Sequence, residues 1–414
     1  MSPTPPPGGP RNGPLAGIVV LDLTQIFNGP YATFLMAAAG AEVIKIEPPG
    51  GEHLRKRSAV KSSQLPYAML NAGKRSLQLD LKTPEGKEIL LRLADEADVL
   101  VENFASGVMD RLGLGAGVLR GRNPRLIYAS STGYGADGPY RDYPAMDLTV
   151  QAMSGVINST GYTDQPPVKA GPAMCDFGAG IHLYGAIVTA IAGRERTGYA
   201  QAVEVSMMEA TYFTLSSNLG MVFTGGENLP ARTGNRHGAL IVCPYNVYPA
   251  ADGYIAIIVN HDGHWRSLVA AFGHAELGTD PRYVNNAARQ QRMQEVDDML
   301  ASWTKPLPRA EVFRRLVSRD PAVPCAPVRD LNEVMHDENM HARGSLQWVD
   351  HPQLGRVVLQ HSPLVFEGTP RRPLEPSRPL GAANAEVLAD WLGHTPEDLA
   401  AWQRDGVIGG ATPG

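Results

Sequence analysis

The chain has 414 residues, a formal charge of −5, and 43% hydrophobic against 19% charged residues. This length predicts two or three domains with a large core. The composition excludes a disordered protein, and the slight acidity offers no basic face to nucleic acid. The three cysteines, Cys175, Cys243 and Cys325, form no C-x-x-C pair. Their spacing excludes a disulfide framework and a standard zinc module, and it fits a reducing compartment.

The N-terminus predicts a tail rather than a targeting signal. Residues 1–14 are mostly Pro and Gly and lack the cationic start and apolar stretch of a signal peptide. We therefore expect a disordered tail. The best apolar run, 178–193, is shorter than a membrane span and contains His182, so we expect a buried helix there. These features predict a soluble, cytoplasmic protein with no nucleic-acid or membrane partner.

Strands and helices alternate through the first 130 residues. The expected strands are 17–23, 42–47, 76–81, 98–101 and 125–130, and the expected helices are 31–39 and 84–97. This order predicts an α/β protein with a parallel sheet covered by helices on both faces. Ligands bind such sheets beyond the C-terminal strand ends. Here those ends lead into the loops 24–30, 102–107 and 131–140.

The second half predicts a smaller α+β unit. This unit begins near Asn235 and has an expected strand at 254–259 and helices near 263–272, 287–303 and 309–319. Helices at about 178–194 and 206–222 precede it, and a terminal helix pair over 384–405 follows it. Residues 225–236 and 321–327 are rich in Gly, Pro or Asn and are interpreted as linkers. The predicted division is a large domain over 15–224, a linker and small domain over 225–326, and a return segment over 327–414 that completes the large domain.

Common nucleotide and metal motifs are missing. The first strand–turn–helix, LDLTQIFNGP, lacks G-x-G-x-x-G, and no P-loop or G-x-S-x-G elbow occurs. His261-Asp-Gly-His264 could suggest a metal site. However, Gly263 separates the two histidines, and Asp262 suits the cap of a following helix. No metal site is predicted.

Asp176 is a lone carboxylate among small and apolar residues, in PAMCDFGAG. One interpretation is a helix N-cap, for which Asp is a preferred residue. The other is a covalent nucleophile that a ligand approaches closely past Gly178 and Gly180, with exposed amides stabilising developing charge. The residues of this stretch alone leave both open.

Six segments together resemble the class III CoA-transferase family, also called CaiB/BaiF. They are LAGIVVLDLTQ…GP…GAEVIKIEPPGG (15–51), LNAGKRSLQLDLKTPEGKE (70–88), ADVLVENFASGVMDRLGLG (97–115), NPRLIYASSTGYGADGPY (123–140), DLTVQAMSG (147–155) and GPAMCDFGAG…SMMEA (171–210). The resemblance covers nearly the whole chain, with a weaker continuation at Ala326–Val328.

The resemblance implies a Rossmann-like large domain built from both chain ends, a small middle domain and an interlocked homodimer. It implies a CoA-transferase in which Asp176 attacks an acyl-CoA thioester, with acyl-anhydride and aspartyl-CoA intermediates. No permanent cofactor is implied, because CoA thioesters are the substrates. The CoA contacts that it implies are Ile26, Phe27, Asn28, Lys74, Arg75, Asn103, Phe104, Arg111 and Tyr134, with Lys74 and Arg75 as phosphate partners and Phe104 stacked on adenine.

Several departures from the family pattern bear on the substrate. Phe27 stands where oxalate-active members carry Gln, and Pro48 where they carry Arg. Their glycine-rich lid has no match. Phe27, Tyr143, Met146 and Met174 predict an apolar wall beside Asp176, which favours an acceptor larger than oxalate. The predicted acceptor is therefore a dicarboxylate of greater size or a larger organic acid. Substrate contacts are predicted for Met146, Gly178, Arg236 and His237, with Arg236 or His237 recognising a second carboxylate.

Three alternatives stay open at this point. A 2-methylacyl-CoA racemase of the same superfamily needs two acid/base groups, but its motif resembles G-H-D-I-N-Y and Met146 stands where its His would be. Asp147 remains, and it suits a cap of the following helix. A subunit of a heteromeric CoA-transferase is the second alternative, although an inert subunit would not need Asp176. The third is a generic nucleotide-binding α/β protein without CoA selectivity.

Overall fold

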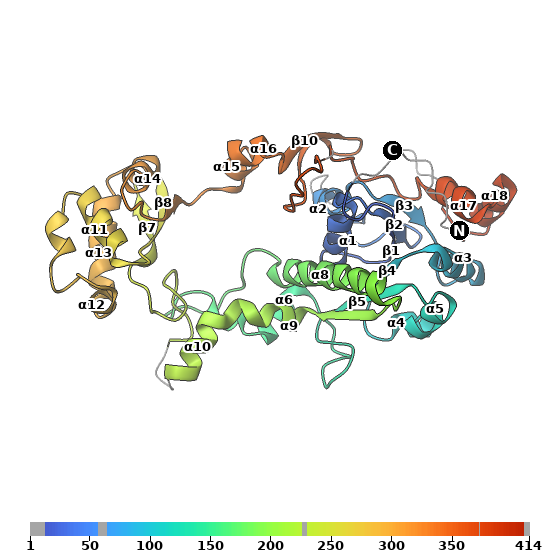
Figure 1. The fold of residues 1–414 in the computed structure, drawn as a ribbon, viewed down its shortest axis with the longest axis horizontal. Coiled ribbons are helices and arrows are strands. Elements are labelled where there is room, and N and C mark those ends of the chain that lie inside the picture. The colour runs from blue at the N-terminus through green and yellow to red at the C-terminus, as the bar shows by residue number, and fades with distance from the viewer. Residues whose placement is uncertain (1–12, 57–63, 226–229, 372, 410–414) are drawn as a thin grey trace. The chain divides into compact units, whose positions relative to one another are not determined.

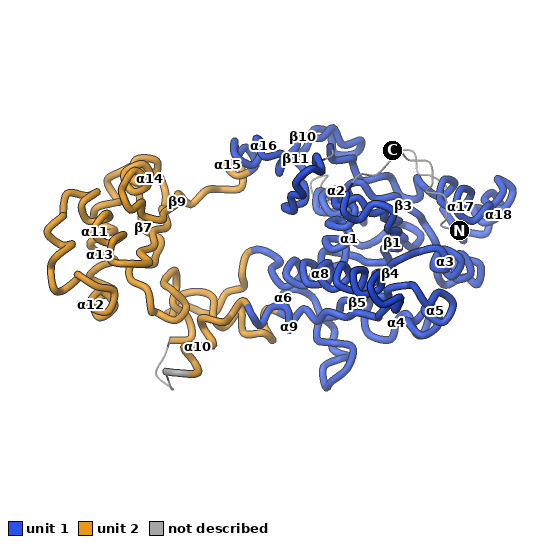
Figure 2. Tube along the Cα trace, in the orientation of Figure 1, with its two compact units in different colours: residues 1–150, 172–213, 335–414 blue, residues 151–171, 214–334 orange. Residues whose placement is uncertain are grey.

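The computed structural model describes residues 13–56, 64–225, 230–371 and 373–409 (Figure 1). The tail expected over 1–14 lies almost wholly outside them, as does part of the linker expected over 225–236. The chain forms two compact units (Figure 2): residues 1–150, 172–213 and 335–414 make unit 1, and residues 151–171 and 214–334 make unit 2. The predicted division had assigned residues 151–171 to the large domain, because this short segment shows no marked change in composition.

Unit 1 is built on a six-stranded parallel sheet with strand order β3-β2-β1-β4-β5-β6. The strands are β1 (Val19–Asp22), β2 (Glu42–Glu47), β3 (Arg75–Gln78), β4 (Val99–Glu102), β5 (Ile127–Thr132) and β6 (Ala202–Ser206). Because β1 pairs with β2 on one side and β4 on the other, the strand order reverses between β1 and β4. The loops beyond this reversal are the usual ligand site of a doubly wound sheet. The α/β prediction is confirmed.

Helices cover both faces of this sheet, and two buried clusters hold the layers together. On one face, Val20 and Val43 pack with residues of α1 (Asn28–Ala38) and α8 (Met174–Thr197). On the other face, Leu21 and Ile44 pack with α3 (Pro84–Glu96), α5 (Ala116–Arg122) and α17 (Asn384–Leu392). Consecutive strand residues thus face opposite layers, as the two-residue period of a strand requires.

Helix α8 is the one described helix long and apolar enough to cross a membrane by length and composition, and core helices of soluble proteins can pass the same test. In the structure, Leu183 and Ile187 of α8 are fully buried against the sheet and α1. The buried helix predicted over 178–193 is therefore confirmed.

The C-terminal part of the chain completes unit 1 beside β3. Ala383 N donates to Ser76 O at 2.9 Å, and Asp80 N donates to Val407 O at 2.8 Å. The remaining elements that lie wholly in unit 1 are α2 (Leu65–Leu70), α4 (Val108–Leu112), α9 (Met207–Tyr212), α16 (Glu338–Ala342), the antiparallel pair β10 (Leu346–His351) and β11 (Gly355–Gln360), and α18 (Pro396–Arg404). Three short elements lie at the unit boundaries: α6 (Asp147–Met153), η2 (Phe213–Leu215) and α15 (Leu331–Met335).

Unit 2 has a core of its own around a three-stranded antiparallel sheet, β7-β8-β9. Its elements are α7 (Val156–Ser159), α10 (Ser216–Gly225), β7 (Tyr245–Ala250), β8 (Gly253–Ile258), α11 (Asp262–Ala271), η4 (Ala275–Gly278), α12 (Asn286–Gln290), α13 (Met293–Thr304), α14 (Arg309–Val317) and β9 (Cys325–Pro327). Trp265, Leu300 and Val312 are fully buried in this core.

Two helices expected as single elements are broken. The helix predicted over 206–222 is α9, a 3₁₀ turn and α10, and the one predicted over 287–303 is α12 and α13. The edge strand β6 was not predicted, because its residues alternate around partly exposed positions. It ends where the Ser206 side chain accepts a hydrogen bond from Glu209 N and caps α9.

A glycine in α8 allows close packing against the first residue of α1. A Cβ at Gly180 would lie 2.6 Å from the backbone oxygen of Asn28, whereas a Cβ at Gly185 would meet nothing within 4 Å. Gly180→Ala should therefore destabilise the fold by about 1–3 kcal/mol, because backbone must move. Gly185→Ala, in the same helix, should be neutral or stabilising. Chemical denaturation measures both, and equal stability of the two variants would contradict this packing.

Candidate active site

Three loops at the C-terminal edge of the sheet are joined by side-chain amides. Asn103, directly after β4, accepts from Gln25 N at 2.8 Å and donates to Gln25 O at 2.8 Å and to Asn28 Oδ1 at 2.6 Å. The Asn28 amide in turn donates to Ser131 Oγ of β5 at 3.3 Å. Asn28 and Asn103, both predicted as CoA contacts, are thus brought together, and they fix the loop that carries Ile26 and Phe27.

Ile26 has a φ of 66°, the left-handed region that β-branched residues rarely adopt. Its amide lies 3.4 Å from Glu52 Oε2, which also accepts from Leu54 N at 3.0 Å. Strained backbone of this kind persists only where neighbouring contacts hold it, and it is common at ligand sites.

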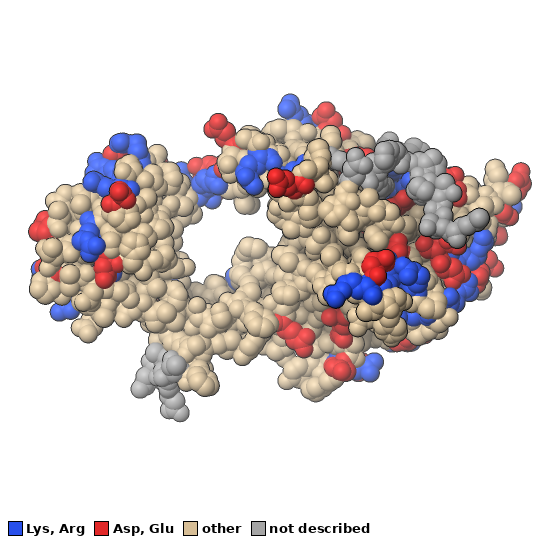
Figure 3. All heavy atoms as spheres, viewed as in Figure 1, with Lys and Arg blue, Asp and Glu red and all other residues tan. Residues whose placement is uncertain are grey.

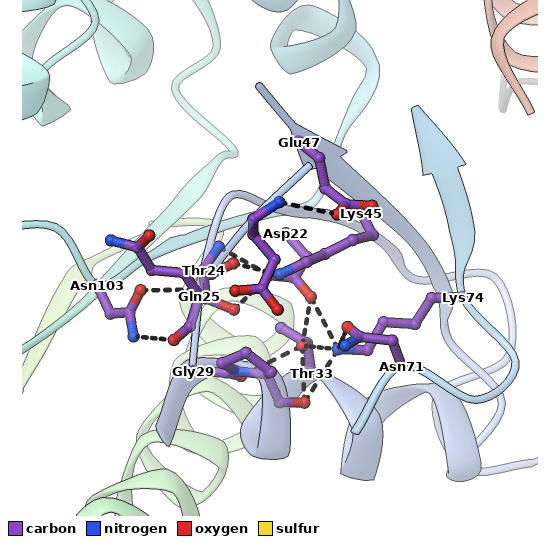
Figure 4. A network of polar contacts seen from close by, with 12 residues as sticks. Asp22, Thr24, Gln25, Gly29, Thr33, Lys45, Glu47, Asn71, Lys74 and Asn103 are labelled. Atoms are coloured by element: carbon purple, nitrogen blue, oxygen red, sulfur yellow. Dashed lines mark hydrogen bonds and ion pairs between the residues drawn. The ribbon is translucent and has the colours of Figure 1, made fainter. Parts of the chain in front are cut away.

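Beneath this loop lies a buried polar network centred on Asp22, the last residue of β1 (Figure 4). Its Oδ2 is 2.9 Å from Lys74 Nζ and 2.6 Å from Thr33 Oγ1, while Oδ1 accepts from Thr24 N at 2.9 Å and lies 3.5 Å from Lys45 Nζ. Burial raises the pKa of Asp22, but the two lysines and the threonine hydroxyls outweigh burial and hold the pKa well below its usual range. Asp22 is therefore a carboxylate that supports the fold.

The predicted phosphate partners Lys74 and Arg75 both face inward, which is a correction. Lys74 Nζ contacts Asp22, Pro30 O, Thr33 and Asn71, and its side chain is 1% exposed. The Arg75 NH1 atom lies 2.9 Å from Glu42 Oε1 without hydrogen-bond alignment, and NH2 lies 3.3 Å from Glu386 Oε1. Because both head groups are buried and paired, the structure does not support their predicted contacts with CoA phosphates.

Asp176 lies in the first turn of α8 and is 8% exposed. Among the described residues, its carboxylate has no hydrogen-bond or ion-pair partner. Burial, followed by the nearby carboxylate of Asp147, raises the pKa of Asp176 to about 7. The side chain is thus poised between acid and carboxylate near neutral pH. Such shifted groups in otherwise apolar surroundings are frequent at active sites.

The next residue connects Asp176 to the loop after β1. The Phe177 ring is 5.8 Å from the Phe27 ring and 5.0 Å from that of Tyr31, centroid to centroid. Ile26, Phe27, Asn28, Asn103 and Asp176 therefore belong to one cluster at the strand reversal. Tyr134 packs against the buried cluster that contains Cys175 and Ala179 of α8, and its ring contacts Tyr140 and Tyr143.

The glycines after Asp176 do not expose their amides, which corrects a second prediction. Gly178 and Gly180 lie inside α8, where backbone amides donate within the helix. Gly180 has a steric role, because it admits the Asn28 carbonyl, whereas a Cβ at Gly178 would meet no atom within 4 Å. The prediction that Gly178 contacts substrate stays a prediction.

A cavity of about 390 Å³ opens beside the ends of β4, β5 and β6. Phe104, Glu102, Tyr128, Arg141 and Glu204 are among its lining residues. Burial raises the pKa of Glu102 to about 7, against hydrogen bonds from Phe104 N and the Tyr128 hydroxyl. Arg111 lies in α4, one helical turn after Gly107. A Cβ added to Gly107 would be 3.1 Å from NH1 of Arg111.

The other predicted substrate residues have different surroundings. Met146 is 55% exposed, just before α6. In unit 2, Arg236 is paired with Asp297 at 2.7 Å and bonded to Gln294, and His237 accepts from Ala239 N. Arg236 thus has a structural partner, and substrate recognition by Arg236 and His237 stays a prediction.

Asp147 and the Asp22 network were not predicted as parts of this site. The strand-end pattern Asp22-x-Thr24 was available as a signal, because Asp and Thr often bond backbone one or two residues on. The packing of Asp147 against α8 joins residues about 30 positions apart, and no local pattern could reveal it.

A doubly wound sheet with loops beyond its strand reversal, and a buried carboxyl at the start of a helix beside them, is the architecture of an α/β enzyme. The model of the protein family described as CoA-transferase family III matches residues 15–384 of the chain. The chain belongs to this family and is a CoA-transferase. The predicted resemblance is thereby confirmed.

Named relatives align over most of their length. The formyl-CoA:oxalate CoA-transferase of Streptomyces avermitilis is 35% identical, covering 95% of this chain and 99% of the relative. The acetyl-CoA:oxalate CoA-transferase of Acetobacter aceti is 38% identical, covering 86% and 90%. The succinate–glutarate CoA-transferase of Agrobacterium fabrum is 35% identical, covering 92% and 96%.

Solved structures show the same fold. A CAIB/BAIF family protein from Brucella suis superposes with a TM-score of 0.80 at 31% identity, covering 92% of this chain and all of the other. A hypothetical protein from Mycobacterium tuberculosis gives a TM-score of 0.79 at 30% identity, covering 92% and 99%.

The charge network at the sheet edge can be tested by its effect on stability. Asp22→Asn keeps the shape of the side chain but leaves Lys74 and Lys45 without their buried counter-charge. The expected loss is about 3–5 kcal/mol of unfolding free energy. The loss should shrink in acid, because a carboxyl with a depressed pKa contributes stability that disappears as pH falls through its folded pKa.

The matched control is Asp95→Asn, which removes an ion pair between Asp95 and Arg122 whose side chains are 35% and 37% exposed. It should cost at most about 1 kcal/mol. Denaturant titrations at neutral and acidic pH measure both variants. A pH-independent loss for Asp22→Asn would contradict the ion-pair assignment.

Proposed function

We propose that this CoA-transferase moves CoA from an acyl-CoA donor to a free carboxylic acid through covalent intermediates on Asp176. The observation that carries the proposal is the buried Asp176 carboxyl, which has no partner among the described residues and titrates near pH 7. A structural cap would be hydrogen-bonded; a nucleophile needs a free oxygen. At neutral and higher pH much of it is ionised, and carboxylates can act as covalent nucleophiles.

The reaction proceeds in two symmetrical halves. The Asp176 carboxylate attacks the thioester carbonyl, the C–S bond breaks, and an acyl-aspartyl anhydride forms beside CoA thiolate. The thiolate then attacks the aspartyl carbonyl, which releases the donor acid and leaves an aspartyl-CoA thioester. The acceptor carboxylate attacks this thioester to give a new anhydride and thiolate. Attack of the thiolate on the acceptor acyl carbon forms the product and regenerates Asp176.

The CoA moiety is proposed to lie across the loops of unit 1. The CoA contacts proposed beside Asp176 are Ile26, Phe27, Asn28 and Asn103. Asn103 is hydrogen-bonded to Asn28, and Phe27 packs against Phe177, the residue after Asp176. Phe104 lines the cavity beside β4, whose volume is within the usual range for ligand pockets, so adenine stacked on Phe104 would occupy it. Arg111 and Tyr134 complete the proposed CoA contacts. No permanent cofactor is needed, because the thioester supplies the energy of the transfer.

The acceptor is proposed to be a dicarboxylate or a larger organic acid. Phe27, Tyr31 and Phe177 form an aromatic wall next to Asp176, which favours an acid with apolar bulk over oxalate. Two relatives carry names that specify oxalate, and another name specifies glutarate. We place the reaction in the cytoplasm, since the three cysteines are free thiols.

Asp176→Asn tests the function directly. The purified protein is incubated with pools of acyl-CoA donors and carboxylic acids, and new CoA thioesters are identified by mass spectrometry. The variant should lose at least about 10⁴-fold in rate, because an amide does not form the anhydride. It should still bind CoA, giving about 2.7 kcal/mol of stabilisation at 100 times the Kd, with no comparable effect of ATP or NAD.

Asp350→Asn, an exposed carboxylate on β10, is the control and should keep full activity. Thioester formation that survives in Asp176→Asn would refute the covalent mechanism. Exchange of the α-hydrogen of 2-methylacyl-CoA with solvent, without transfer, would favour the racemase alternative.

The active form is proposed to be an interlocked homodimer. Large apolar side chains are exposed along the segment from η2 to α10: Phe213 is 79% exposed, Val222 71% and Phe223 92%. Single chains seldom leave such side chains open to solvent together. On the visible face of the spheres, in contrast, Lys and Arg lie among Asp and Glu (Figure 3).

Sedimentation equilibrium should therefore give twice the 44.5 kDa chain mass. Phe223→Asp should shift the mass toward one chain, while Asp350→Asn should not. If the wild-type protein has the mass of one chain and forms no new thioester, this result would favour the heteromeric alternative.

A further inference from the structure

The start of α8 is capped by a carboxylate from another helix. The residue before α8, Ala173, provides no side-chain cap. Instead, Asp147 Oδ1 accepts from Cys175 N at 2.9 Å and from Asp176 N at 3.2 Å. These are two of the amides that an α-helix leaves without internal partners in its first turn.

These hydrogen bonds close a loop in the chain. Asp147 is the first residue of α6, and the chain then leaves unit 1 as residues 151–171 before it returns at residue 172. The bonds thus join the last turn before this departure to the first turn after the return. Asp147 thus caps the start of α8, whereas the sequence suggested a cap of the helix that follows it.

We propose that Asp147 is a positioning residue for Asp176: it holds the first turn of α8 by its two amide contacts and places a second negative charge beside the nucleophile. This inference rests on the proposed function and deepens it. Asp147 touches the backbone that carries the nucleophile, and it takes no part in bond making.

The same arrangement sets the acidity of the nucleophile. The two amides bound to Asp147 are unavailable to the Asp176 carboxylate, so they do not stabilise its charged form. The titratable groups that face this turn are Asp147 from α6, Cys175 within α8, Tyr134 from the loop after β5 and Tyr31 from α1. Burial raises the pKa values of Cys175 and Tyr31, so both are neutral at pH 7.

Removing the charge of Asp147 should therefore lower the pKa of Asp176. A carboxyl with a lower pKa stays ionised to lower pH, and the acid limb of kcat moves downward. A higher pKa in the wild-type protein makes the carboxylate a stronger nucleophile. The charge of Asp147 thus lowers activity at acidic pH and raises the nucleophilicity of the Asp176 carboxylate at neutral pH.

The decisive pair is Asp147→Asn and Asp147→Ala. Asn keeps an oxygen that can accept from both amides but carries no charge. Its acid limb should fall by roughly one pH unit, with KM for the acyl-CoA unchanged. Ala also loses the cap, so kcat should fall further, by about 10²-fold, through misplacement of Asp176. Asp142→Asn, with a side chain 82% exposed, is the control and should match wild type.

A measurement without substrate separates this proposal from the proposed function. A diazo reagent esterifies protonated carboxyls, and peptide mass spectrometry between pH 5 and 9 would give the midpoint of protection at Asp176. The midpoint should lie near 7 in wild type and be lower in Asp147→Asn. If the midpoint is lower in Asp147→Asn but the wild-type protein shows no turnover, the transferase mechanism is refuted and the effect of the Asp147 charge on Asp176 still stands.

Unchanged midpoints in Asp147→Asn would overturn the proposal, as would equal kcat losses in the Asn and Ala variants without a pH shift. If Asp147→Ala does not fold, the Asn variant alone decides the charge effect, since it retains the acceptor.

Discussion

The ion pair between Asp22 and Lys74 is the interaction on which the active-site edge of this protein depends. Asp22 ends β1 and lies at the strand reversal, and Lys74 reaches it from the turn before β3. Lys74 also binds Pro30 O and Thr33 of α1, so one ammonium group ties a strand end, a helix start and a turn together. Such a buried pair is costly to break. The loop with Ile26, Phe27 and Asn28 can therefore adopt strained backbone and still be held in place.

The pKa values of two buried carboxyls, Asp22 and Asp176, are shifted in opposite directions. Asp22 has cations and hydroxyls around it, so its pKa is held low although it is fully buried. Asp176 is buried, and the nearby carboxylate of Asp147 adds to the effect of burial, so its pKa rises to about 7. The first group is neutralised by partners and serves stability. The second has no hydrogen-bond or ion-pair partner for its carboxylate among the residues that the structure describes, as the proposed nucleophile requires. This contrast, rather than burial by itself, separates a structural carboxylate from a candidate nucleophile.

The sequence predicted the sheet because buried strands leave local patterns, whereas Asp176 was assigned as the nucleophile through the family resemblance and stays a prediction. Apolar runs such as GIVVLDL and EVIKIE mark buried strands, and β2 has the predicted bounds. The wrong or missing elements depend on partners distant in the chain. β6 is a strand only because β5 lies beside it. Lys74 and Arg75 were predicted as partners of CoA phosphates, and their inward direction follows from Asp22, Glu42 and Glu386. The contact of Asp147 with α8 is likewise a product of tertiary structure.

Two adjacent residues, Met146 just before α6 and Asp147 at its start, bear on which reaction this fold favours. Met146 is exposed, and its thioether cannot carry a proton. Asp147, the next residue, is bound to the amides of the helix that carries Asp176. A histidine at position 146 would bring a proton carrier close to the turn that Asp147 holds, as a racemase requires. With methionine there, position 146 supplies no proton carrier, and the proposed chemistry depends on the carboxylate of Asp176. The proposed acyl transfer therefore fits the side chains at the starts of α6 and α8 better than proton transfer does.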